Sequence, residues 1–185
     1  TGTWNVISGT GSIGSFNSPN TTVSGMGPGL NVFQWIISNG TCPPSRDTIV
    51  ILVYAPPSTA AAGADQSICG PTTNLAATTP TIGTGTWTLV SGFATITTAT
   101  SPTSGLTSVA VGQNVFVWTV TNGNCNPSRD TVIVTRDQQP TVSAAGPDQA
   151  ICSGSSVFAA NTPTIGTGIW NVISGTGSVT SFTRR

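Results

Sequence analysis

The middle of the chain, residues 57–137, is divided by Gly, Pro and Asn into short runs rich in Val, Ile, Thr and Trp. In the run 114–121, the apolar side chains Phe116, Trp118 and Val120 occupy every second position. Successive side chains of a β-strand point to opposite faces of a sheet, so this spacing predicts a strand with one buried face. No run shows a sustained helical period, and the pattern therefore predicts an all-β chain.

The same pattern returns at a fixed interval along the chain without an insertion or a deletion. The interval from Trp4 to Trp87 is 83 residues (87 − 4), and so is the interval from Trp87 to Trp170 (170 − 87). Trp35 and Trp118 have the same spacing. A period of this length is too long for one turn of a solenoid and suits one small domain. The sequence therefore indicates a tandem array of similar domains.

The array holds one complete repeat and parts of two others. We expect 1–54 to be the C-terminal part of a first repeat, 57–137 to be a complete repeat, and 140–185 to be the N-terminal part of a third. Within the complete repeat, strands are expected in residues 58–68, 73–78, 85–91, 94–97, 105–111, 114–121 and 129–135. About seven short strands with one apolar face are typical of an antiparallel, Ig-like sandwich of two sheets.

Comparison of the copies predicts which side chains are buried. Val117 corresponds to Gln34 one period earlier, so this position is expected to face solvent, whereas its neighbours Phe116 and Trp118 stay aromatic in both copies. A fixed aromatic position between variable ones favours a core role over an exposed glycan platform. The expected structural core consists of Trp87, Trp118 and Phe116, with Trp4, Trp35 and Trp170 at equivalent positions of the other repeats.

The charge inventory excludes several classes of function. Only 5% of residues are charged, the formal net charge is zero, and the chain has no Lys, Glu or His. There is thus no basic surface for a nucleic acid and no polybasic patch for a membrane, and we expect neither as a partner. The missing side chains also remove the usual general bases, so the protein is not expected to be an enzyme.

A metal or cofactor is not expected either. Calcium takes six to eight oxygen ligands, usually from several carboxylates, and the Asp residues of this chain stand singly without an Asp-x-Asp motif. The cysteines form no C-x-x-C motif and have no His nearby, which argues against a zinc or redox site. Regularly spaced cysteines in a small β domain instead favour disulfides in an oxidising compartment.

Two disulfide arrangements respect the period. We favour Cys69–Cys125, because a small domain with a marginal core gains most from a staple that closes its own long loop. This choice leaves Cys42 and Cys152 to pair outside the fragment. The alternative joins Cys42 to Cys69 and Cys125 to Cys152, and so links consecutive repeats.

A salt bridge is also expected at one end of the sandwich. Arg129 opens the last expected strand, and Asp65 lies at a break in the first one. Both recur one period away, as Arg46 and Asp148. With so few charges in the chain, we expect Arg129 and Asp65 to pair, in a partly exposed bridge worth about 0–1 kcal/mol.

The complete repeat carries AGADQSICG, then LAATTPTIGTGTWTLVSG, SPTSGL and NVFVWTVTNGNCNPSRDTVIVT. On these motifs the chain resembles, over all 185 residues, the PKD-like/Ig-like repeats of giant Bacteroidetes surface proteins, including gliding-motility-associated adhesins of the type IX secretion route. The resemblance implies a β-sandwich, an extracellular location and a long tandem parent. Two features depart from it. GTGTWTLVSG stands where PKD domains carry a WDFGDG-type motif, and the Ig-type disulfide between facing mid-strand positions is absent.

The sequence favours a structural role. We expect a repeat module of an extracellular adhesin, stalk or filament at the bacterial cell surface, in which sandwiches in series advance by about 35–45 Å per period. The alternative is a carbohydrate-binding module of a secreted polysaccharide-degrading protein. The expected partners are neighbouring repeats, identical chains that join into a fibre by strand addition, or a glycan or other surface ligand.

Overall fold

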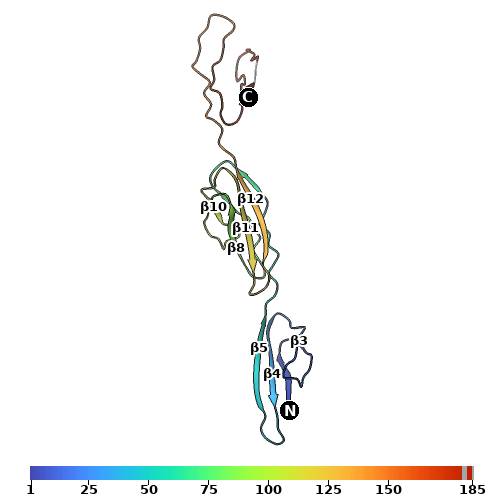
Figure 1. Ribbon diagram of the computed structural model, residues 1–185. Coiled ribbons are helices and arrows are strands. Elements are labelled where there is room, and N and C mark those ends of the chain that lie inside the picture. The colour runs from blue at the N-terminus through green and yellow to red at the C-terminus, as the bar shows by residue number, and fades with distance from the viewer. Residues whose placement is uncertain (181–182, 185) are drawn as a thin grey trace.

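The computed structural model describes residues 1–180, 183 and 184. Every regular element in this part of the chain is a β-strand. The strands form three units that follow one another along a line, with the N-terminus near one end of the molecule and the C-terminus near the other (Figure 1). The chain is therefore an extended series of units, each folded largely on itself.

The central unit is a sandwich of two sheets, which confirms the predicted fold class. A four-stranded sheet has the order β6-β12-β11-β8, and a three-stranded sheet has the order β7-β10-β9. The seven strands are β6 (Gln66–Ile68), β7 (Thr73–Asn74), β8 (Thr84–Ser91), β9 (Thr95–Ile96), β10 (Gly105–Thr107), β11 (Gly112–Thr121) and β12 (Ser128–Arg136).

One pairing departs from the expected antiparallel arrangement. β6 runs parallel to β12, with Gln66 opposite Val134 and Ile68 opposite Arg136. The expected first strand, 58–68, is also shorter than predicted, because only its last three residues form β6. The chain bends before β6 at Gly63, which has a φ of +90° and so adopts a conformation that favours glycine.

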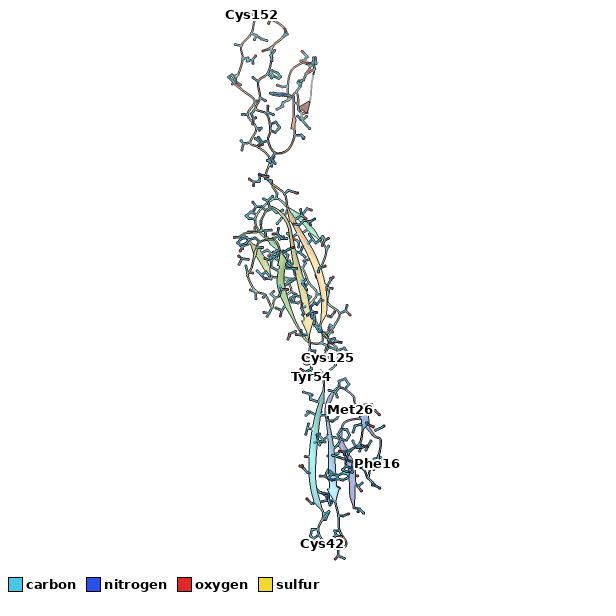
Figure 2. All side chains as sticks on the ribbon, in the orientation of Figure 1. Phe16, Met26, Cys42, Tyr54, Cys125 and Cys152 are labelled. Atoms are coloured by element: carbon cyan, nitrogen blue, oxygen red, sulfur yellow. The ribbon has the colours of Figure 1, made fainter. Side chains whose placement is uncertain are left out.

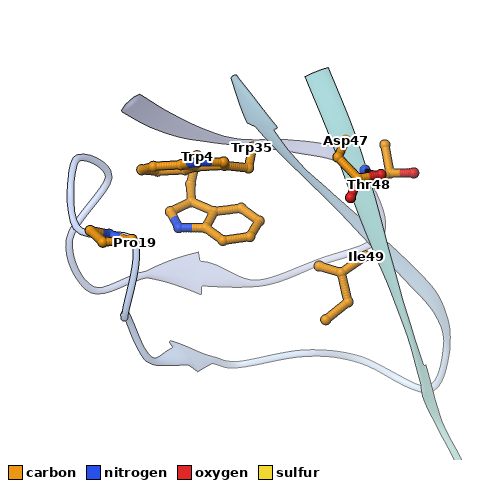
Figure 3. Close-up of a pocket in the computed structure, with 6 residues that line it drawn as sticks. All are labelled: Trp4, Pro19, Trp35, Asp47, Thr48 and Ile49. Atoms are coloured by element: carbon orange, nitrogen blue, oxygen red, sulfur yellow. Dashed lines mark hydrogen bonds between the residues drawn. The ribbon is translucent and has the colours of Figure 1, made fainter. Parts of the chain in front are cut away.

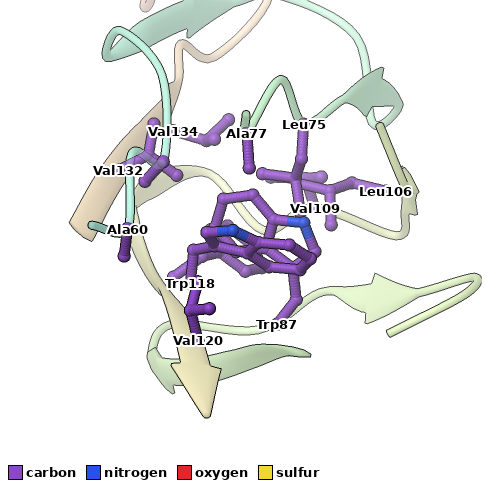
Figure 4. Close-up of a cluster of buried hydrophobic side chains, with 12 residues drawn as sticks. Ala60, Leu75, Ala77, Trp87, Leu106, Val109, Trp118, Val120, Val132 and Val134 are labelled. Carbon is purple, nitrogen blue, oxygen red and sulfur yellow. The ribbon is translucent and has the colours of Figure 1, made fainter. Parts of the chain in front are cut away.

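The core lies between the two sheets and is built on a pair of tryptophans. Trp87 of β8 stands directly opposite Trp118 of β11, and their ring centroids are 5.0 Å apart with the planes tilted by 45°. Trp118 and Phe116 are fully buried, and Trp87 is 2% exposed. Figure 4 shows both indoles at the centre of the cluster. The remaining core residues are Ala60, Ala62, Leu75, Ala77, Leu106, Val109, Val120, Val132 and Val134.

The N-terminal unit repeats the later strands of the central one. Its main sheet has the order β1-β4-β5, beside a two-stranded sheet of β2 and β3. Trp4 and Trp35 pair as Trp87 and Trp118 do, with centroids 5.0 Å apart. The strands are β1 (Gly2–Ser8), β2 (Ser12–Ile13), β3 (Val23–Ser24), β4 (Gly29–Ile37) and β5 (Ser45–Val53).

Burial in the N-terminal unit is incomplete, which corrects the expected core. Trp4 and Trp35 are only half-buried, and Ile49 is 49% exposed although the equivalent Val132 is 1% exposed. In the central unit, residues 58–77 cover this face, whereas the N-terminal unit starts at a position equivalent to Thr84. The sheet is thus formed, but one face of it is open.

The C-terminal unit contains two short strands, β13 (Gly168–Ile169) and β14 (Thr183–Arg184), which pair with each other. Trp170 packs against Phe158 with ring centroids 4.8 Å apart, but it is half-buried rather than a core residue. The expected third part, 140–185, includes residues 181, 182 and 185, which lie outside the described residues.

Candidate functional site

The loop between β11 and β12 contacts the segment that leaves the N-terminal unit. The side-chain amide of Asn122 donates a hydrogen bond of 2.8 Å to the carbonyl oxygen of Ala55. The sulfur of Cys125 lies 3.5 Å from the carbonyl oxygens of both Tyr54 and Ala55. Figure 2 places Tyr54 and Cys125 together between the two units. These residues, with Gly123, form what we call the junction clamp.

Gly123 has a steric role in the junction clamp. Its φ is +53°, and a Cβ atom added to it would collide with the ring of Tyr54. The ring therefore packs directly on the backbone of the loop, which only glycine allows without displacement. The Asn122-Gly123 pair recurs as Asn39-Gly40, so the same loop is available one repeat earlier.

A hydroxyl on the linker fixes the start of each repeat. The Ser58 hydroxyl accepts hydrogen bonds from the backbone N–H groups of Thr81 and Ile82, at 3.0 and 2.7 Å. The backbone N–H of Ser58 in turn donates to the carbonyl of Ile82 at 3.0 Å. Thr141, one period later, makes the same three contacts. The linker thus enters both repeats in the same way.

The recurrent Ser-Arg-Asp motif holds the first segment of the repeat against β12. The Ser128 hydroxyl accepts a hydrogen bond of 2.9 Å from the N–H of Ala60, and the Asp130 carboxylate accepts one of 2.7 Å from the N–H of Ala62. Side chains therefore replace the backbone ladder that this segment lacks. The motif is structural, and its two outer residues do the bonding.

The expected salt bridge between Arg129 and Asp65 is corrected. Asp65 accepts a hydrogen bond of 2.8 Å from the backbone N–H of Ile133 instead. Both Arg129 and Asp65 are exposed, and a solvated carboxylate gains more from a well-aligned backbone donor than from a mobile guanidinium. The recurrent Asp therefore ties the bend before β6 to β12.

The favoured disulfide between Cys69 and Cys125 is also corrected. Cys69 follows Ile68, which pairs with Arg136 at one end of β12, whereas Cys125 lies in the loop before Ser128 at the other end. A strand of this length separates the two ends by roughly 25 Å, while a disulfide needs Cα atoms within about 7 Å. All four cysteines are free thiols.

The alternative pairing fails for a related reason. Figure 2 shows Cys42 at the outer end of the N-terminal unit, Cys125 between the first two units, and Cys152 at the outer end of the C-terminal unit. A complete sandwich separates Cys125 from Cys152. Cys42 and Cys69 likewise lie at distant ends of two successive units. Neither of the two expected arrangements is compatible with units in series.

A groove opens on the exposed face of the N-terminal unit. Trp4 and Trp35 form its floor, and Ile49 of β5 lies on the opposite side (Figure 3). Asp47 and Pro19 stand at its edges. A second apolar groove adjoins it and is lined by Trp4, Ile13, Thr21, Val23, Met26, Phe33, Ile49 and Ile51.

In the central unit, the residues equivalent to those lining this groove are covered by another segment of the chain. Trp87, Trp118 and Val132, the equivalents of its lining residues, are buried there beneath Ala60 and Leu75. These two residues come from the first part of the repeat, before β8. The residues that line this groove are therefore equivalent to residues that segment 58–77 covers in the central unit.

Sequence reasoning missed one recurrent buried residue, Asn114. Its side-chain oxygen accepts a hydrogen bond of 2.9 Å from the N–H of Phe93, and its amide donates to the carbonyls of Ala110, Gly112 and Val134. The residue is fully buried. The detectable signal was its equivalent one period earlier, Asn31, in a position next to the aromatic core.

Neither a metal centre nor a membrane span emerges from the described residues. Within that part of the chain, no three His, Cys, Asp or Glu side chains are grouped in a way that suits a metal ion. No helix capable of crossing a bilayer occurs among residues 1–180, 183 and 184.

The chain matches no family model, and no curated protein matches it. Among solved structures, it is similar to the solution structure of the PKD domain from the KIAA 1837 protein. The two share 23% sequence identity with a TM-score of 0.39, over 50% of this chain and 93% of that chain. The two-sheet fold described above rests on the strand pairing of this chain alone.

Proposed function

We propose that this chain is a structural repeat module whose function is to hold successive sandwiches in a line. The observation that carries this proposal is the junction clamp, in which Asn122 and Cys125 of one unit contact Tyr54 and Ala55 of the unit before it. A short linker held at both ends resists bending. The array then acts as a spacer whose reach is set by the number of repeats.

The setting proposed for this spacer is an adhesin, stalk or filament outside a bacterial cell, with any binding tip elsewhere in the array. Its support is the composition: periodic cysteines suit an oxidising compartment, and a surface rich in Thr, Ser and Gly suits an anchored protein better than a crowded cytosol. The module itself is non-catalytic in this proposal and needs no cofactor. Its partners are neighbouring repeats, or identical chains that complete one another.

A carbohydrate-binding module is less well supported. Such a module needs a row of exposed aromatic side chains on which sugar rings can stack. The tryptophans of the central unit lie inside its core, and Phe93, which is 64% exposed, stands apart from them. Titration with a panel of soluble polysaccharides tests this alternative, and saturable binding by the central repeat would favour it.

The spacer proposal is tested by measuring length against repeat number. Chains of one, two and three consecutive copies of residues 57–139 would be compared by small-angle X-ray scattering. The maximum dimension is expected to grow by about 35–45 Å per copy, because strands of this length run along the axis of the array. A maximum dimension that levels off after the second copy would show that repeats fold back on each other and would reject the spacer.

A further inference from the structure

The thiol of Cys125 points at the end of the preceding unit. Its sulfur is 3.5 Å from the carbonyl oxygens of Tyr54 and Ala55, the residues that directly follow β5. Cys125 is partly exposed and free. The side chain is thus directed at the junction and not at its own sandwich.

Cys69 lies at the opposite end of the same unit, beside the start of the next linker. The carbonyl of Ile68 accepts a hydrogen bond of 2.8 Å from the N–H of Asp137, the residue that follows β12. The guanidinium of Arg136 is 3.5 Å from the carbonyl oxygen of Cys69. The parallel pairing of β6 with β12 therefore delivers Cys69 to the point where the chain leaves the sandwich.

The period brings these two observations together. Asp137 and Tyr54 are one full period apart and so occupy the same position in successive repeats. In a complete repeat, the residue at this position donates its backbone N–H to the residue just before the Cys69-type cysteine, as Asp137 does to Ile68. The thiol of Cys125 contacts the carbonyl at this very position in the unit before it. The Cys69-type cysteine of one repeat and the Cys125-type cysteine of the next therefore both lie close to the position of Tyr54 and Asp137 at each junction.

We propose that consecutive repeats are joined by a disulfide between the Cys69-type cysteine of one repeat and the Cys125-type cysteine of the next. Under this rule the partner of Cys69 is the cysteine one full period beyond Cys125, and the partner of Cys125 is the cysteine one full period before Cys69. The positions that would pair with Cys42, Cys69, Cys125 and Cys152 in this way fall outside residues 1–185. None of these four cysteines is bonded to another among the described residues.

The bond forms by thiol–disulfide exchange with a small or protein disulfide such as oxidised glutathione. One cysteine thiolate attacks the glutathione disulfide and releases one glutathione thiolate. The second cysteine then attacks the mixed disulfide and releases the other. The protein loses two protons and two electrons, and the oxidant becomes two thiols. Cys69 is exposed and Cys125 partly so, which leaves both open to this exchange.

This proposal deepens the spacer function, because a covalent joint fixes the clamp that holds units in line. The test uses the present chain with residues 57–83 added before Thr1, so that the first unit becomes a complete repeat. Cys42, the original Cys69 and Cys152 are replaced by Ser, which leaves the added copy of Cys69 and Cys125. Circular dichroism in reductant establishes that this extended chain is folded before oxidation.

After equilibration with oxidised glutathione, we expect the extended chain to lose both titratable thiols and to yield a crosslinked peptide containing the added Cys69 and Cys125. Two free or separately glutathionylated thiols in the folded chain would overturn the proposal. As a matched control, the 185-residue chain with Cys42→Ser and Cys152→Ser keeps Cys69 and Cys125. It should form no intramolecular disulfide, and formation of one would also overturn the proposal. A failed crosslink with an unchanged scattering length would reject the disulfide and leave the spacer intact.

Discussion

The indole ring of Trp118 lies directly over the backbone of Gly85 on the neighbouring strand. A Cβ atom on Gly85 would collide with three atoms of the six-membered ring of Trp118. Gly2 stands in the same relation to Trp35 in the N-terminal unit. The recurrent Gly-Thr-Gly-x-Trp motif therefore contains a residue that must lack a side chain for the tryptophan pair to form.

This relationship predicts that Gly85→Ala destabilises the central unit, although alanine ordinarily suits a strand better than glycine. The methyl group forces the ring of Trp118 out of its place, and overpacking of this kind costs about 1–3 kcal/mol. Urea denaturation followed by tryptophan fluorescence measures the change. Gly70→Ala is the matched control, because nothing lies within 4 Å of its Cβ position. Equal midpoints for the two variants would contradict the prediction.

Truncation of the tryptophan itself should distinguish the closed unit from the open one. Trp118→Ala is expected to cost about 3–5 kcal/mol, since the side chain is fully buried. Trp35→Ala should cost less, because the equivalent ring is half-buried beside an open groove. The comparison comes from hydrogen exchange of backbone amides at increasing denaturant concentration. It is measured in the central unit for Trp118→Ala and in the N-terminal unit for Trp35→Ala. A similar loss in both units would show that the groove face is closed in solution.

Asn114 is expected to matter as much as an apolar core residue. Asn114→Ala removes the partner of the Phe93 N–H and leaves the buried carbonyl of Val134 without this donor, at a cost of about 1–3 kcal/mol for an unsatisfied group. Asn74→Ala, at an exposed position, should change the free energy of unfolding by less than about 0.5 kcal/mol. Both values come from urea melts, and an effect of Asn114→Ala no larger than that of Asn74→Ala would refute the role assigned to it.

The junction clamp offers a pair of variants with the same backbone and different neighbours. Gly123 and Gly40 have φ values of +53° and +55°, but only Gly123 packs on a ring, that of Tyr54. Gly123→Ala and Gly40→Ala therefore share the conformational penalty of alanine at positive φ. Only Gly123→Ala should also loosen the angle between the first two units, measured by residual dipolar couplings. Equal inter-unit order in both variants would show that the clamp does not set the angle.

Much of the fold could be predicted because alternation and repetition are local signals. Trp35 recurs as Trp118 one period later, whereas Gln34 is replaced by Val117 at the neighbouring position. This comparison was enough to assign the buried face of β11. The positions of the cysteines were not predictable in this way. Their pairing depends on which end of the sandwich each strand reaches, and the parallel entry of β6 places Cys69 at the end opposite to Cys125.

The errors in the candidate site have a common physical cause. Pairing Arg129 with Asp65 treated charge as the dominant interaction. In the structure, Asp130 instead bonds the N–H of Ala62, which lies outside the strands, and Asp65 bonds the N–H of Ile133 in β12. Which backbone N–H groups require a side-chain acceptor can be seen only once the path of the chain is known. The open face of the N-terminal unit was hidden for the same reason, because Trp4 and Trp35 have core spacing whether or not a covering segment is present.

That open face leads to the last prediction, which concerns self-association. A peptide of residues 57–83 should bind the N-terminal unit, because in the central unit the same residues bury Ala60 and Leu75 against the equivalent groove. Its backbone is expected to find the acceptors Ser45 and Asp47, which correspond to Ser128 and Asp130. The peptide contains no Trp, so quenching or blue shift of tryptophan fluorescence in the isolated segment 1–54 reports binding directly.

The expected outcome of that titration is a saturable blue shift, as the indoles of Trp4 and Trp35 pass from a half-exposed to a buried environment. A peptide with Leu75→Asp is the control, since a carboxylate cannot enter an apolar groove without a large desolvation cost. Asp47→Ala in the receiving unit should weaken binding by removing an acceptor for one backbone N–H. Saturable binding that is lost with the Leu75→Asp peptide and weakened by Asp47→Ala would support strand addition as the route by which separate chains join. Identical curves for the normal and Leu75→Asp peptides would show that the groove does not select the segment, and assembly by strand addition would then be rejected.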